Sequence, residues 1–218
     1  MAADSSATGS DARRYAGMSG LAFVVLFGAG SALWGLEMPA PGSPATEVVD
    51  FYRETSNRIV VGASLSLVGI AVFVLFAASV RQVLVEAGGD DFLATTAFGG
   101  ALLGMAAGLG AETINMVGAL RAHDGELSDA LARSLFETSQ ILGSTASGVG
   151  VAIFALATAV TALRTGQVLP RSLALIVLAI GIVLLTPLSH ISEVTGGALL
   201  LVTLIIAPVL LPYSRRHA

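Results

Sequence analysis

The sequence predicts an all-α protein: a polytopic membrane helix bundle with six transmembrane helices and a short extracytoplasmic amphipathic helix. The chain has 218 residues, of which 55% are hydrophobic and only 12% are charged, and its mean hydropathy is +0.84. A soluble domain carries about 25% charged residues. Several apolar runs approach or exceed the roughly 18 residues expected of a membrane-crossing helix. These observations predict one membrane bundle, without room for a large soluble domain.

The composition excludes several kinds of chemistry. The chain contains no cysteine, and all 11 of its basic residues are arginine. Disulfides, thiolate metal sites, cysteine nucleophiles, lysine catalysis and a retinal Schiff base are therefore excluded. The formal net charge of −4 does not indicate an electrostatic partner, and nothing in the sequence indicates nucleic-acid binding.

The first helix is predicted over residues 16–34, after Arg13 and Arg14. Residues 1–12 are small and polar, so we expect a disordered cytoplasmic N-terminus. A twin-arginine signal peptide is the alternative interpretation of this region. The apolar run is long for a signal, and no small-x-small cleavage site follows it, which favours a retained helix.

The first external connection covers residues 37–58. Prolines between residues 39 and 44 end the first helix. Val48, Phe51 and Tyr52 then share one face of a short helix whose acidic residues lie elsewhere. This pattern predicts an amphipathic helix on the membrane surface. The alternative is a hydrophobic lid over the bundle.

Five further helices follow. They are predicted over residues 59–80, 92–120, 128–163, 172–189 and 196–212. The third and fourth helices are joined by a polar hairpin that turns at Asp124 and Gly125. The transmembrane domain thus covers residues 13–213, and residues 214–218 form a cytoplasmic tail.

Arginine placement predicts the orientation, because cytoplasmic segments of membrane proteins are enriched in basic residues. With both termini inside, the inner segments hold seven arginines and the outer segments four. The inner set is Arg13, Arg14, Arg81, Arg164, Arg171, Arg215 and Arg216, and the outer set is Arg53, Arg58, Arg121 and Arg133. Both termini are therefore predicted to be cytoplasmic.

Two segments resemble a known group of proteins. The first is Pro-Gly-Ser-Pro-Ala-Thr-Glu-Val-Val-Asp-Phe-Tyr, followed by Arg58 at the start of a helix. The second is Ala-Leu-Arg-Thr-Gly-Gln-Val-Leu-Pro-Arg, residues 162–171. Both are similar to a widespread, uncharacterised group of actinobacterial six-helix membrane proteins, and the resemblance covers most of the chain from the first helix onward. It implies the architecture and a bacterial inner (plasma) membrane, but no mechanism.

A glycine stripe marks the third helix. Gly100, Gly104 and Gly108 form two overlapping Gly-xxx-Gly motifs. Such motifs allow the backbones of two helices to approach closely. The partner of the stripe is either the fourth helix or another subunit.

Polar residues continue this stripe and form the candidate site. Glu112 and Asn115 follow the glycines, and Glu137 and Gln140 lie at matching height on the fourth helix. A charged side chain at mid-bilayer costs on the order of 3 kcal/mol, so we expect Glu112 to face the bundle. These residues either hydrogen-bond between helices or bind a small ligand or a proton. For Glu137, pairing with Arg133 at the water interface is a further alternative.

His190 and Glu193 lie one helical turn apart on the outer side. With Glu112 and Glu137 they would make a His-carboxylate metal site. No His-x-x-x-His or Glu-x-x-His spacing supports it, and haem would need a second buried histidine. The sequence therefore predicts no metal and no cofactor, although His190 and Glu193 stay among the candidate ligand-binding residues.

The functional prediction is an integral membrane protein that binds or transports a small ligand or proton at this extracytoplasmic cluster. The alternative is a non-catalytic scaffold or accessory subunit, acting as a homo-oligomer or with a membrane partner protein. An intramembrane enzyme is the weakest option, because no Ser/His/Asp set, metal motif or nucleotide motif supports it.

Overall fold

The computed structural model describes residues 5–186 and 192–211, with side chains for residues 13–186 and 194–211. This part of the chain is helical throughout and contains no strand, which confirms the predicted all-α class. In chain order the elements are α1 (Ser5–Ala32), the short 3₁₀ helix η1 (Gly35–Glu37), α2 (Ala45–Glu86), α3 (Asp91–His123), α4 (Asp129–Ile141), the π-helical turn η2 (Leu142–Ala146), α5 (Ser147–Thr165), α6 (Arg171–Leu184) and α7 (Ser192–Leu210).

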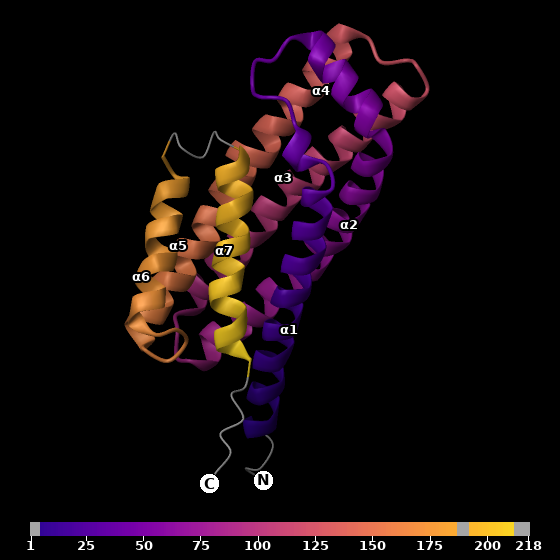
Figure 1. The fold of residues 1–218 in the computed structure, drawn as a ribbon. Helices are drawn as coiled ribbons and strands as arrows, with labels where there is room; N and C mark the ends of the chain where they lie inside the picture. The colour runs from indigo at the N-terminus through magenta and orange to yellow at the C-terminus, as the bar shows by residue number, and fades with distance from the viewer. Residues whose placement is uncertain (1–4, 187–191, 212–218) are drawn as a thin grey trace.

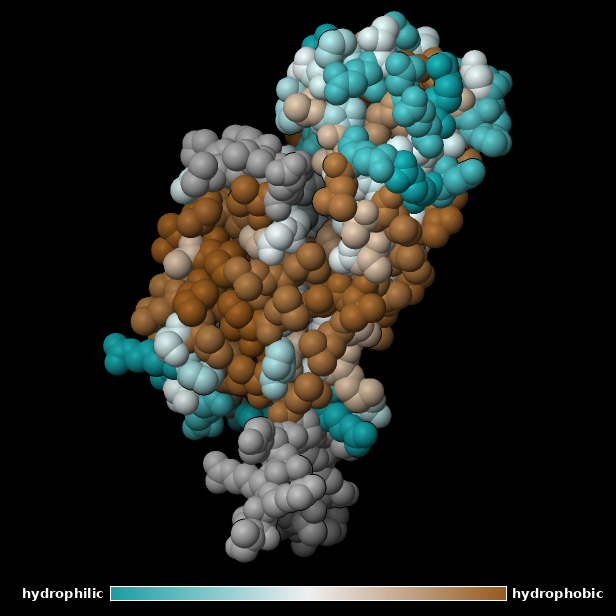
Figure 2. All heavy atoms as spheres, in the orientation of Figure 1, coloured by the Kyte–Doolittle hydropathy of each residue, from teal (hydrophilic) through white to brown (hydrophobic). Residues whose placement is uncertain are grey.

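Four helices of the described chain are long and apolar enough to cross a membrane: α1, α2, α3 and the continuous rod of α4, η2 and α5. The helices α6 and α7 are apolar but shorter. Figure 2 shows hydrophobic residues forming a wide belt around the middle of the molecule, with hydrophilic residues above it and along its lower edge. The architecture is that of a membrane helix bundle.

Neighbouring helices in the chain pack side by side for most of the bundle. The helix α1 packs against α2 and α7, α2 against α3, α3 against α5, and α5 against α6. The start of α1 and the end of α7 lie at the same end of the molecule (Figure 1). At the opposite end, the beginning of α2 and the α3–α4 hairpin rise above the other helices.

α1 is longer than predicted. It begins at Ser5, so residues 5–12 belong to the helix and not to a disordered terminus. Extending an existing helix adds one hydrogen bond for each residue that becomes ordered, whereas starting one is costly. The helix formed by the apolar part of α1 therefore extends into the preceding polar residues.

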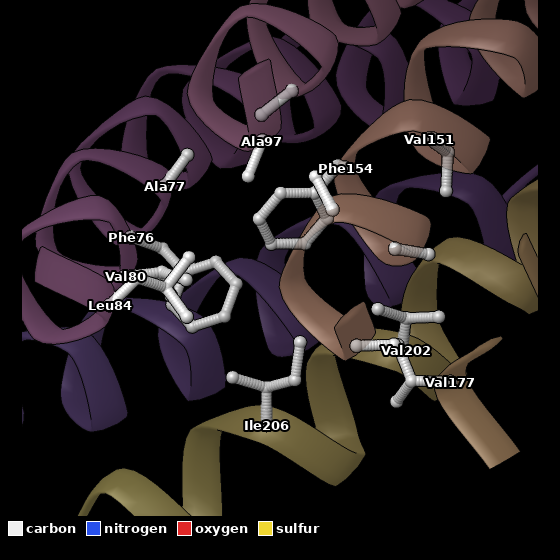
Figure 3. Close-up of a cluster of buried hydrophobic side chains, with 14 of the residues drawn as sticks. Phe76, Ala77, Val80, Leu84, Ala97, Val151, Phe154, Val177, Val202 and Ile206 are labelled. Atoms are coloured by element: carbon white, nitrogen blue, oxygen red, sulfur yellow. The ribbon is translucent and has the colours of Figure 1, made fainter. Parts of the chain in front are cut away.

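The main core joins α1, α2, α5 and α7 through aromatic packing. The Phe73 ring on α2 meets the Phe23 ring of α1 with centroids 4.7 Å apart, and the Phe154 ring of α5 at 5.8 Å. Figure 3 shows Phe76 and Phe154 together, with Ile206 of α7 nearby. Lipid chains are as apolar as these side chains, so the hydrophobic effect does not drive the helices together in a membrane. The contacts stabilise the bundle by dispersion instead.

Two glycines of the predicted stripe lie where α3 crosses α5. A Cβ atom on Gly100 would lie 2.7 Å from the Phe154 backbone nitrogen, and one on Gly104 would lie 3.1 Å from the Ser147 carbonyl oxygen. A Cβ on Gly108 would have only ordinary contact, 3.8 Å from Ile70 of α2. The backbones of α3 and α5 can approach this closely only because both positions lack a side chain.

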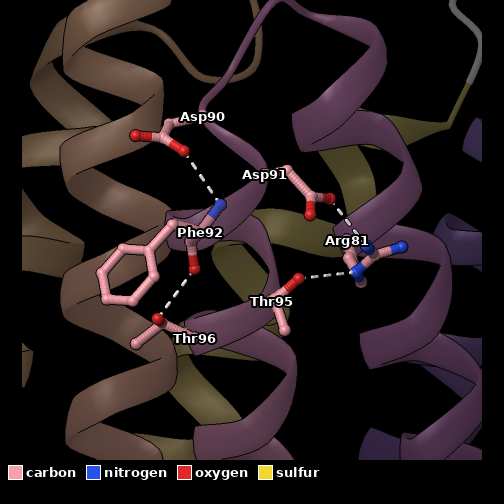
Figure 4. A network of polar contacts seen from close by, with 6 residues as sticks. All are labelled: Arg81, Asp90, Asp91, Phe92, Thr95 and Thr96. Carbon is pink, nitrogen blue, oxygen red and sulfur yellow. Dashed lines mark hydrogen bonds and ion pairs between the residues drawn. The ribbon is translucent and has the colours of Figure 1, made fainter.

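A polar network fixes the turn between α2 and α3 (Figure 4). The Asp90 side chain caps α3 by accepting a hydrogen bond of 2.9 Å from the Phe92 backbone nitrogen. Arg81 at the end of α2 pairs with Asp91 at 2.7 Å and donates to Thr95 at 3.3 Å. Capping satisfies backbone N–H groups that otherwise lack a partner at a helix start. The two helices are thereby held together at the lower edge of the belt.

The hydrophilic part above the belt, here called the head (residues 34–59 and 119–140), has its own apolar core. Val48, Tyr52 and Ile59 of α2 pack there with Ala119 of α3 and Phe136 of α4. A separate surface helix, as predicted, is not observed, because α2 runs unbroken from Ala45 to Glu86. No glycine or proline interrupts it before Gly62. The apolar face of this segment covers the bundle, as in the alternative of a hydrophobic lid.

Candidate functional site

A pocket of about 340 Å³ lies between α1, η1, α3, α7 and the α4–η2 segment, where the belt meets the head. Phe27, Trp34 and Leu200 provide much of its apolar wall. Glu112, Asn115, Ser139 and Gln140 supply polar groups. This Glu112 pocket has the composition of a small-molecule site, an apolar surface with a few polar groups.

Among the described residues that line the pocket, Glu112 is the only acidic one. Its side chain is 7% exposed, and its Oε2 atom has no hydrogen-bond partner in the described chain. The Ser66 hydroxyl of α2 lies beside the carboxyl, but no hydrogen bond of normal length joins them, and Ser66 Oγ is unpartnered too. Burying a polar group without a hydrogen bond costs about 1–3 kcal/mol, and more if it is charged.

Two of the described residues with an unpartnered polar atom, Trp34 and Glu112, line this pocket. Of the four buried side-chain atoms without a hydrogen bond in the described residues, three belong to Trp34, Ser66 and Glu112. Trp34 Nε1 faces α2, where a Cβ on Gly62 would lie 3.1 Å from it. Buried polar groups in native proteins nearly always have a partner, so the Glu112 carboxyl has hydrogen-bonding capacity that no described residue uses.

Asn115 is held by the head. The Tyr52 hydroxyl donates a hydrogen bond of 3.0 Å to Asn115 Oδ1, and both side chains are buried. The Tyr52 ring fits because Gly118 lacks a side chain: a Cβ there would lie 2.7 Å from the ring. Asn115 is therefore oriented by a structural contact one turn away from Glu112.

Gln140 has a weaker partner. Its Nε2 atom lies 2.8 Å from the Met38 sulfur, and a thioether is a poor hydrogen-bond acceptor. The neighbouring Ser139 is buried, and its hydroxyl donates to the Phe136 carbonyl oxygen at 2.8 Å. Of the two carboxamides in the wall, Gln140 would therefore lose less hydrogen-bond energy than Asn115 if a ligand replaced its partner.

The π-helical turn η2 forms part of the same wall through Gly143. It is tied to its surroundings by Ser144, whose hydroxyl donates to the Gln140 carbonyl oxygen at 2.5 Å. The Ser144 carbonyl oxygen in turn accepts a bond of 3.2 Å from Thr195 of α7. Single π turns within α-helices occur frequently at functional sites.

The π turn also explains the position of Glu137. Phe136, Ser139 and Ser144 are buried on the inward face. Ser139 and Ser144 are five positions apart across η2, whereas successive inward residues of a regular α-helix are three or four positions apart. A straight α-helix would have brought Glu137 inward. Instead its side chain is 51% exposed, and its carboxylate pairs with Arg133 at 2.7 Å. The structure therefore separates Glu137 from Glu112, as the alternative of an interfacial ion pair would require.

The six predicted ligand-binding residues thus divide into three groups. Glu112, Asn115 and Gln140 line one pocket, and Glu137 lies outside it. His190 and the side chain of Glu193 lie outside the described residues. Two lining residues, Trp34 and Ser139, were not predicted as site residues, and neither was Ser66, which lies beside the Glu112 carboxyl. Ser66 belongs to a run of small residues with Gly62, the one sequence signal for close helix packing at this position.

Neither a metal centre nor a known relative assigns a chemistry to the pocket. Among the described histidine, aspartate and glutamate side chains, no group of three could hold a metal ion. Comparison of the chain with protein-family models, curated proteins and solved structures finds no match. The pocket's own groups are one carboxyl, two carboxamides and small hydroxyls in an apolar wall.

Proposed function

We propose that this chain is a six-helix integral protein of a bacterial plasma membrane that binds or transports a small amphiphilic molecule in the Glu112 pocket. One observation carries the proposal. The Glu112 carboxyl is buried at the wall of the pocket, and its Oε2 atom has no partner among the described residues. A carboxyl in the membrane region is retained at a considerable cost, which a ligand that bonds to it would offset.

The chemistry of the wall defines the ligand class. Phe27, Trp34 and Leu200 favour an apolar body, and Glu112 favours a polar end that donates hydrogen bonds, such as an ammonium or hydroxyl group. The volume of about 340 Å³ lies at the lower end of the roughly 300–1,000 Å³ range of ligand pockets. The ligand is therefore a small amphiphile with one donor end.

The proposed topology has six spans, with both termini in the cytoplasm and the head outside. The charges support this orientation. Within the described chain, every head arginine has a carboxylate partner, whereas Arg13, Arg14, Arg164 and Arg171 at the other end have none. The positive-inside rule counts basic residues, and seven of the 11 arginines lie in the segments placed inside. The pocket then lies toward the extracytoplasmic surface.

A non-catalytic scaffold or accessory subunit is the second candidate. Two contacts favour it, the Tyr52–Asn115 hydrogen bond and the Gln140–Met38 contact, because both simply connect neighbouring elements. They account for Asn115 and for much of Gln140. They leave the Glu112 Oε2 atom unexplained, so ligand binding is the better proposal.

The test uses the fluorescence of Trp34, the one tryptophan in the chain. The protein in phosphatidylcholine nanodiscs is titrated with n-octylamine, whose ammonium group can bond to the Glu112 carboxylate. We expect a saturable change in Trp34 emission, with an affinity about 10- to 100-fold lower in Glu112→Gln, as for the loss of a hydrogen bond to a charged group.

The matched control is Glu137→Gln, which removes an exposed carboxylate from the same region. Its titration should equal that of the wild type, and n-octanol should bind more weakly than n-octylamine. An emission change that does not saturate, or that is the same in Glu112→Gln, would refute the proposal.

A further inference from the structure

A second cavity lies at the other end of the bundle, away from the Glu112 pocket. It is a groove of about 700 Å³ between the start of α1, the α5–α6 loop and the end of α7. Arg13 and Arg171 line it, together with apolar side chains that include Leu163, Leu175 and Val209. This arginine groove lies where hydrophilic residues border the lower edge of the hydrophobic belt (Figure 2).

No described acidic side chain compensates the positive charge in the groove. Neither Arg13 nor Arg171 forms an ion pair with a described side chain, and none of the described residues that line the groove is acidic. The acid Asp90 lies with Arg164 in a hollow that shares Gln167 with the groove. Asp90 already accepts a hydrogen bond from the backbone of α3.

Most of the other described arginines have a carboxylate partner. Arg53, Arg58, Arg121 and Arg133 in the head each lie within ion-pair distance of a carboxylate. Arg81 at the lower edge is paired as well. The two groove arginines therefore differ from most of the described arginines, in that they share one cavity and have no carboxylate partner among the described side chains.

We infer that the arginine groove binds the head group of an anionic phospholipid. Guanidinium groups bind phosphate through paired, charge-assisted hydrogen bonds. Basic pockets between membrane helices on the cytoplasmic side bind acidic lipid head groups. A lipid suits this groove better than a free phosphate ion, because the apolar side chains beside the arginines would face the acyl chains.

The experiment measures lipid affinity of the full chain in a neutral detergent. Native mass spectrometry follows the binding of phosphatidylglycerol and of phosphatidylcholine with the same acyl chains. We expect phosphatidylglycerol to bind more tightly. The affinity should fall about fivefold for Arg13→Gln and for Arg171→Gln, as for the loss of one cation near an anionic lipid, and further for the double variant.

The matched control is Arg14→Gln. Arg14 is exposed at the same end of α1 but does not line the groove, so this variant should keep the wild-type preference. The lysine variants Arg13→Lys and Arg171→Lys keep the charge and should retain part of the affinity. They also provide a readout if a glutamine variant does not fold.

Three results would overturn the inference. Equal binding of the two lipids would remove the need for a negative head group. An equal loss in Arg14→Gln would indicate a diffuse surface charge and not this groove. Complete displacement of the lipid by millimolar inorganic phosphate would identify a soluble anion as the ligand. Glu112→Gln should leave lipid binding unchanged, so this test and that of the Glu112 pocket can fail independently.

Discussion

The Tyr52 hydroxyl on α2 donates a hydrogen bond to Asn115 Oδ1 on α3 at a distance of 3.0 Å. It joins the apolar core of the head to the wall of the Glu112 pocket. Asn115 is therefore oriented from above, by a part of α2 outside the belt. The geometry of the pocket depends on the head, and substitutions in the head should change the position of the Asn115 side chain.

Tyr52→Phe should lower the free energy of unfolding by about 1–2 kcal/mol, because Asn115 Oδ1 would remain buried without its donor. Unfolding in mixed micelles measures this. Tyr15→Phe is the control, since Tyr15 is 68% exposed and should tolerate the change. A double-mutant cycle with Asn115→Leu should show coupling between the two residues. Additive effects would contradict a hydrogen bond between them.

Gly104→Leu should destabilise the bundle by about 1–3 kcal/mol or more, because a side chain cannot fit between α3 and α5 without moving a backbone. Gly99→Leu is the matched control on the same helix, where a Cβ would meet nothing within 4 Å. Thermal unfolding in detergent should separate the two variants. Equal stability would mean that α3 and α5 do not meet at Gly104.

Reporter fusions should establish the orientation. A fusion after Gly88, in the α2–α3 turn, should report the cytoplasm, and one after Gly125, in the α3–α4 hairpin, the extracytoplasmic side. Both glycines lie in turns with positive φ, 77° and 75°, at opposite ends of α3. The reverse pattern would contradict the arginine argument and would move the Glu112 pocket to the cytoplasmic half.

Hydropathy alone was sufficient to predict the helical membrane bundle, and the spacing of Gly100 and Gly104 indicated close helix packing. The spacing also indicated an inward Glu112, since a lipid-facing carboxyl would have neither water nor a partner. Glu137 was assigned to the same cluster because the fourth helix was taken as a regular α-helix. The extra residue in η2 rotates α4 relative to α5, and sequence periodicity does not reveal such a turn.

The head could not be predicted for a related reason. Residues 37–58 were predicted as an external connection with a short surface helix, and a separate membrane helix was predicted to begin at residue 59. Outside the belt, however, a helix can be polar on one face and continue, and α2 does so because Thr55 and Ile59 keep its other face buried. The Tyr52–Asn115 contact depends on this continuity and so lies beyond sequence reasoning.

An experimental electron-density map of the protein purified from its own membrane, without added ligand, would test ligand binding in the Glu112 pocket most directly. We expect elongated density in the pocket that is longer than a water molecule, with one end within hydrogen-bond distance of Glu112 Oε2. Density explained fully by ordered water, or a Glu112 side chain with both oxygens bonded to protein groups, would contradict the account.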